Sequence, residues 1–197
     1  MNRRMLIAAV LIPLPWFLLW SLLGGALAPD YSAISQHASE LTVRLGLPHT
    51  LLNVAAIGSG IGFAVFAIGL WLESGRRLAV GALCWLVFGI SMISNGVWPM
   101  GNPLHGLYIL GLSNLIAPSL SLLELARLRD NKFAYWLTAF VSVAAIAYLW
   151  MNLNGLDPQN YRGLTQRIFS SINSLWPAAV ALLLLSKFSS SGGVPNS

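Results

Sequence analysis

The chain has 197 residues, of which 56% are hydrophobic and only 9% are charged. A soluble globular domain usually carries about a quarter charged residues, so this composition argues against a water-soluble protein and favours a surface that faces lipid. The net charge is +5, yet the 11 Lys and Arg residues lie in short segments between apolar stretches. Because no basic face accompanies a soluble fold, we expect no nucleic-acid partner. The single cysteine, Cys84, rules out a disulfide within the chain.

Six apolar stretches are each long enough for a helix that crosses a hydrocarbon core of about 30 Å. No strand-like alternation competes with them. We therefore predict an all-α integral membrane bundle of about six transmembrane helices, as a single domain over residues 1–188 with a disordered tail over 189–197. The predicted helices span about 5–27, 51–72, 78–98, 103–125, 133–153 and 166–186.

The first stretch also has features of a signal peptide, because Arg3 and Arg4 precede it and the small-residue sequence Ala26-Leu27-Ala28 ends it. Its apolar run is longer than a usual signal core, so we expect a retained transmembrane helix. Cleavage after Ala28 is the alternative and would leave five helices.

The basic residues predict how the helices thread through the membrane. Six helices place both termini on one side, and the side with the termini then holds more Lys and Arg, as expected for the cytoplasmic side of a cell membrane. The predicted cytoplasmic set is Arg3, Arg4, Arg76, Arg77, Arg127, Arg129, Lys132 and Lys187, whereas the outer set is Arg44, Arg162 and Arg167.

The long first outer loop has an apolar periodicity of its own. Residues 32–45 (SAISQHASELTVRL) place Ile34, Ala38, Leu41 and Leu45 on one side of a helix, and Gly46 and Pro48 follow as stop signals. We predict a short amphipathic helix that lies at the outer membrane interface.

Polar side chains are costly in lipid, so those within the predicted helices should face the bundle interior or a wet cavity. Several of them gather near the predicted outer face, which suggests a polar pocket open to that side. The candidate ligand-binding residues are Glu40, Asn95, His105 and Arg167, with Ser39 and Ser170 as secondary members.

Each of these residues also has a structural interpretation. Arg167 either extends to lipid headgroups or pairs with Glu40 and pins the interfacial helix to the last helix. His105 is equally compatible with a packing role. Asn95 and Asn114 are candidates for hydrogen bonds that hold neighbouring helices together. Ser39 would act as a nucleophile only if folding brought a histidine to it.

Three segments resemble a bacterial and archaeal membrane family known as domain of unknown function 998. They are 31–41 (YSAISQHASEL), 95–107 (NGVWPMGNPLHGL) and 163–167 (GLTQR), in the family's order and spacing over nearly the whole chain. The resemblance implies that the positions of interest are Ser39, Glu40, Pro99, His105 and Arg167. The family usually has an acidic residue shortly after the proline, where this chain has Met100, Gly101 and Asn102. The resemblance implies no activity.

The sequence therefore predicts a multi-pass membrane protein whose outer pocket binds a lipid headgroup, a lipid-linked molecule or a small polar ligand. Membrane lipids are the expected partners, and we expect no cofactor and no metal, since the histidine spacing matches no zinc motif. One alternative is a non-enzymatic accessory protein whose polar residues only pack helices. Another is a membrane hydrolase or transferase that uses His105 and Glu40 as acid and base.

Overall fold

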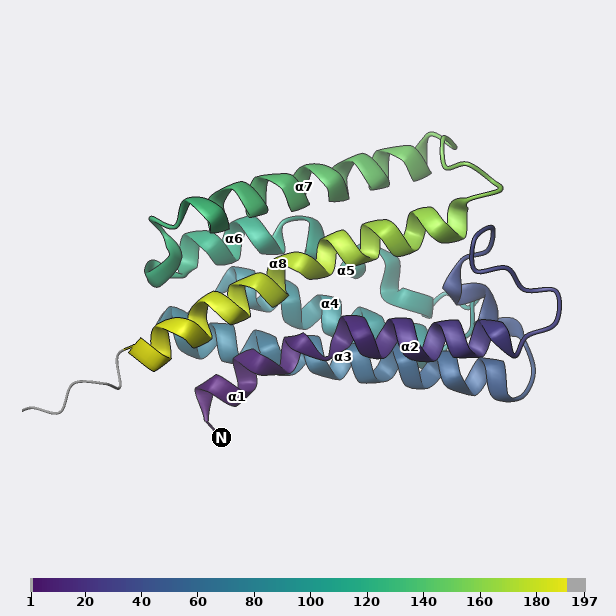
Figure 1. The fold of residues 1–197 in the computed structure, drawn as a ribbon, viewed down its shortest axis with the longest axis horizontal. Helices are drawn as coiled ribbons and strands as arrows, with labels where there is room; N and C mark the ends of the chain where they lie inside the picture. The colour runs from purple at the N-terminus through teal and green to yellow at the C-terminus, as the bar shows by residue number, and fades with distance from the viewer. Residues whose placement is uncertain (1, 191–197) are drawn as a thin grey trace, which may run out of the picture.

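A computed structural model describes residues 2–190 and shows a bundle of helices with no strand in that range. The first membrane span combines α1 (Arg3–Ala8), the 3₁₀ turn η1 (Ala9–Leu11) and α2 (Pro13–Ala26). The other long helices are α3 (Leu47–Ser74), α4 (Val80–Val97), α7 (Lys132–Leu153) and α8 (Arg162–Ser190). These five spans are long and apolar enough to cross a membrane, so the predicted all-α membrane bundle is confirmed (Figure 1).

The fourth predicted span is broken rather than continuous. In place of one helix over 103–125 the chain forms η3 (His105–Leu107), α5 (Tyr108–Gly111), η4 (Leu112–Leu115) and α6 (Ala117–Glu124), with a bend of 47° before α6. Gly106 and Leu107 both have positive φ, at 68° and 43°, which no α-helix accommodates. Counted as one bent span, these pieces bring the number of spans to six.

Side chains and special residues set the ends of the regular helices. Pro48 occupies the first turn of α3, where its missing N–H costs nothing, and Gly75 ends α3 with a φ of 63°. Asn131 begins α7 because its Oδ1 accepts from Ala134 N at 2.9 Å. At the start of α4, both Glu124 oxygens accept from Gly81 N, so a carboxylate from α6 caps that helix.

The predicted interfacial helix over 32–45 is wrong in extent. The chain forms turns and then the 3₁₀ helix η2 (Ala38–Val43). Only the middle of the predicted apolar stripe is buried, since Leu41 is fully covered whereas Ile34 and Leu45 are 52% and 93% exposed. The expected tail over 189–197 begins too early, because α8 continues to Ser190, and residues 191–197 lie outside the described part.

Glycines allow α3 to pack closely against its neighbours on two sides. A Cβ on Gly58 or Gly62 would lie within 3 Å of Trp16 or Pro13, so this face of α3 receives the first span. On the other side, Gly60 and Gly89 meet where α3 crosses α4, and a Cβ on either would lie within 3 Å of the other's carbonyl oxygen.

Aromatic side chains fill the core between the two halves of the bundle. Trp85 of α4 stacks on Trp176 of α8 with ring centroids 5.7 Å apart, and Phe66 of α3 meets Trp85 edge-on. Trp176 is fully buried, and its Nε1 donates to Thr138 Oγ1 of α7 at 2.7 Å. This cluster joins α3, α4, α7 and α8.

One end of the bundle, called the basic end below, is tied by charged side chains. Glu73 lies 3.3 Å from both Arg3 and Arg127, which joins the start of α1 and the end of α3 to the 3₁₀ turn η5 (Ala126–Leu128). Arg4 donates to Phe188 O at 2.7 Å, so the start of α1 and the end of α8 lie together (Figure 1). The opposite end, called the pocket end, carries the loop that follows α2 and the loop between α7 and α8.

Candidate functional site

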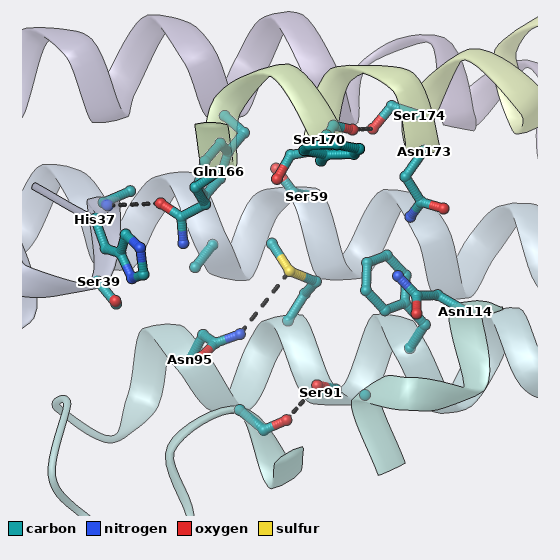
Figure 2. A pocket seen from close by; sticks show the side chains of 18 of the residues that line it. His37, Ser39, Ser59, Ser91, Asn95, Asn114, Gln166, Ser170, Asn173 and Ser174 are labelled. Carbon is teal, nitrogen blue, oxygen red and sulfur yellow. Dashed lines mark hydrogen bonds between the residues drawn. The ribbon is translucent and has the colours of Figure 1, made fainter. Parts of the chain in front are cut away.

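A cavity of about 550 Å³ lies inside the bundle on the side of the pocket end. Its volume is in the range of ordinary small-molecule sites. Segments from α2, α3, α4, the broken fourth span, α7 and α8 line it, together with part of η2 (Figure 2). Phe17, Phe63 and Phe88 give it apolar walls, and hydroxyl and carboxamide side chains interrupt them. The cavity therefore suits a molecule with both apolar and polar parts.

A roof segment, residues 31–44, covers the start of α8 and is held there by Arg167. The Arg167 Nη1 donates to the carbonyl oxygens of Ala33 at 2.7 Å, Gln36 at 3.3 Å and Gly163 at 2.9 Å. Its Nη2 donates to Tyr31 Oη at 2.8 Å. Burial raises the pKa of the Tyr31 phenol above its usual range despite the nearby guanidinium, so the phenol stays protonated at neutral pH.

Two further contacts fix the roof segment on α8. Gly163 lies so close that a Cβ there would be 2.1 Å from Gln36 O. Gln166 Oε1 accepts from Ala38 N at 2.8 Å, which serves the first turn of η2. The start of α8 therefore acts as the platform on which this segment folds.

The pairing of Glu40 with Arg167, one of the two alternatives for that arginine, is not observed. Glu40 lies 3.3 Å from Arg162 and also accepts from His37 N at 2.9 Å and from Gln36 Nε2 at 3.0 Å. These contacts hold the roof segment together from its outside, and Glu40 does not line the cavity. Arg162 lies more than one helical turn before Arg167 on α8. Glu40 therefore pairs with Arg162, which is the more exposed of the two arginines.

Five of the six candidate residues do line the cavity: Ser39, Asn95, His105, Arg167 and Ser170. His105 is 2% exposed, and its Nδ1 lies 2.7 Å from Trp98 O. Because a carbonyl only accepts, Nδ1 is the donor in this contact. Within residues 2–190, no hydrogen bond joins Ser39 Oγ to a histidine, although His37 and His105 line the same cavity.

Five carboxamides line the cavity, and two of them, Asn152 and Gln166, already have backbone partners. The other three, called the amide triad below, come from three different elements: Asn95 of α4, Asn114 of η4 and Asn173 of α8 (Figure 2). Asn173 is 9% exposed, and its Oδ1 is buried without a hydrogen-bond partner. Among the hydrogen bonds of the described residues, none involves the amide of Asn114, and that of Asn95 makes only a 3.9 Å contact with Met92 Sδ. The role of Asn95 and Asn114 in holding helices together is therefore not seen.

The sequence reasoning did not select Asn114, Asn173 or His37 as site residues. Asn114 and Asn173 are polar residues at mid-depth of predicted apolar helices, whereas Asn95 was selected because it lies near the predicted outer face. His37 lies in the roof segment, and its Nε2 is 3.7 Å from Asp157 of the loop before α8. Within residues 2–190, no three His, Cys, Asp or Glu side chains are grouped so that they would hold a metal ion.

The comparisons with known proteins give a family and no activity. The family model described as "Protein of unknown function (DUF998)" matches residues 11–183. This match covers every residue that lines the cavity. No curated protein and no solved structure matches the chain.

Proposed function

Since this chain belongs to the DUF998 family, whose description names no activity, we propose its function from the cavity: the protein binds an amphiphilic molecule, either a membrane lipid or a lipid-linked compound, at the outer face of the cell membrane. The bound molecule would place its apolar part against the phenylalanine walls of the cavity and its polar part against the amide triad.

The charge at the two ends supports this placement. The basic end carries the eight Lys and Arg residues of the predicted cytoplasmic set, and the pocket end carries Arg44, Arg162 and Arg167. Basic residues accumulate on the cytoplasmic side of membrane proteins. We therefore assign both ends of the described chain to the cytoplasm and the cavity to the outer half of the membrane.

The amide triad is the observation that carries the proposal. Each side-chain amide has two donor hydrogens and an acceptor oxygen, and an unpaired amide in an apolar medium costs about 2 to 7 kcal/mol. Side chains that only packed helices would donate to one another or to a neighbouring backbone. The three side chains instead line the cavity without such partners, so a polar ligand there would pair with them.

The alternative of a hydrolase or transferase has less support. It needs an acid and a base within reach of the same substrate. His105 lines the cavity, but Glu40 does not, and no other Asp or Glu of the described residues does. The proposal is therefore binding without an assigned reaction.

Filling the cavity tests the proposal. Ala145 of α7 lines the cavity, whereas Ala147 is exposed on another face of the same helix. We expect the wild-type protein and Ala147→Trp, purified in a detergent that removes loosely bound lipid, to carry one lipid or lipid-linked molecule in native mass spectrometry. Ala145→Trp should reduce its occupancy about tenfold, which corresponds to about 1.4 kcal/mol. A wild-type protein without a bound molecule, or equal occupancy in both variants, would contradict the proposal.

A further inference from the structure

We propose that the polar part of this ligand is an uncharged, hydroxyl-bearing headgroup of the kind found in glycosyl lipids, read by the amide triad of Asn95, Asn114 and Asn173. This inference rests on the proposed function and adds the chemical class of the ligand. Three observations carry it: the free polar groups of the triad, the lack of acidic groups in the lining, and the state of the only strong cation there.

The triad offers donors and acceptors together. Asn173 is nine-tenths buried, and its Oδ1 has no partner, so this oxygen would accept a hydrogen bond from a ligand. The amides of Asn95 and Asn114 add donor hydrogens from two other elements and, apart from the weak contact with Met92, are likewise free. A hydroxyl group both donates and accepts, so several hydroxyls on one ring would pair with all three amides.

The lining has little to offer a phosphate. Its only Lys or Arg is Arg167, whose Nη1 is shared by three carbonyl oxygens and whose Nη2 donates to Tyr31, so only its buried Nε is left without a partner. Phosphate binding sites usually present several charge-assisted donors that are free for the anion. Along α8, Asn173 is six residues beyond Arg167, or about 9 Å at 1.5 Å per residue, so a headgroup at the triad lies away from that charge.

The lining also has little to offer a cationic headgroup. No Asp or Glu of the described residues lines the cavity. Of the nearby acids, Glu40 pairs with Arg162, and Asp157 lies beside His37. A buried ammonium needs a paired charge to offset the loss of its hydration. The neutral headgroup is thus the class that satisfies the amides without adding an unpaired charge.

Binding of three lipids with identical acyl chains to the purified full chain tests this inference. The probes are a monoglycosyl diacylglycerol, phosphatidylglycerol and phosphatidylethanolamine, each titrated in mixed micelles and followed by native mass spectrometry. We expect the dissociation constant of the glycosyl lipid to be at least about tenfold lower than those of the two phospholipids. Equal binding of the three, or preference for either phospholipid, would overturn the inference and leave the proposed function intact. Binding of none would remove both.

Variants of the triad then locate the preference. The double variant Asn114→Leu, Asn173→Leu keeps side-chain size and should lose the roughly tenfold preference for the glycosyl lipid, while the exposed Asn160→Leu should retain it. Thermal unfolding without added lipid separates binding from structure. The double variant should unfold at the wild-type temperature or above it, because unpaired amides are removed. A large fall in that temperature, or an unchanged preference, would show that the triad does not read the headgroup.

Discussion

Replacement of Arg167 by alanine should lower the free energy of unfolding by about 3 to 5 kcal/mol, because it removes several hydrogen bonds from a charged donor, each worth about 1.5 to 3 kcal/mol, and leaves carbonyl oxygens unpaired. The guanidinium joins three carbonyl oxygens and Tyr31, and it is 9% exposed. Without it the carbonyls of Ala33 and Gln36 lose their partner on α8 and the roof segment loses its anchor. Denaturant unfolding in mixed micelles measures the change.

Two variants serve as controls for the loss of Arg167. Arg162→Ala removes the ion pair with Glu40. Because the Arg162 side chain is 45% exposed, this loss should cost no more than about 1 kcal/mol. Arg167→Lys keeps the charge but not the planar fork, so most of the loss should remain. If Arg167→Ala were no more destabilising than Arg162→Ala, Arg167 would not anchor the roof segment.

Gly89→Ala should have an effect of similar size, about 3 kcal/mol, for a different reason. A Cβ on Gly89 would lie 2.7 Å from Gly60 O and 2.9 Å from Ala64 N, which are backbone atoms of α3 that cannot turn away. The two helices must separate along their crossing, and the packing of their neighbours is lost with it. Thermal unfolding in detergent and the yield of folded protein both report this change.

Gly75→Ala provides the matched control for Gly89→Ala. Gly75 has open space around its Cβ position but a φ of 63°, so alanine there meets backbone strain without a steric contact. Its cost should be about 1 to 2 kcal/mol. Equal destabilisation by the two variants would mean that the crossing of α3 and α4 tolerates an added methyl group.

The sequence predicted the regular spans well because their apolar length decides them. The helix expected over 133–153 is observed as Lys132–Leu153, and the one expected over 78–98 as Val80–Val97. The prediction of a continuous fourth helix was wrong because apolar length carries no information about backbone conformation. Gly106 and Pro118 were the available signals, as a glycine that permits positive φ and a proline that favours a helix start.

The roof segment shows a second limit of sequence reasoning. Its apolar periodicity favours a helix, but tertiary contacts with Arg167 and Gln166 use its carbonyl and N–H groups instead. Periodicity also could not decide whether Glu40 would meet Arg162 or Arg167, since both lie near the start of α8. Which arginine Glu40 meets depends on where the roof segment lies along the axis of α8.

The candidate site was predicted in outline and refined by the amides. Asn95, His105 and Arg167 were selected because polar side chains are costly in lipid and should face the bundle interior. All three line the cavity. Asn114 and Asn173 satisfy the same criterion, but their place on the cavity wall depends on the bend in the fourth span and on how α8 is turned. Neither is visible in the residue order.

The bend in the fourth span has a consequence for backbone exchange with heavy water. A wall made of one 3₁₀ turn, the four-residue α5 and a second 3₁₀ turn has few consecutive helical hydrogen bonds, so it opens locally at lower free energy than the unbroken α3 beside it. Amide hydrogens of residues 105–116 should therefore be replaced by deuterium faster than those of residues 51–72, although both stretches lie at membrane depth. A molecule seated in the cavity is expected to slow replacement in the first stretch and leave the second unchanged.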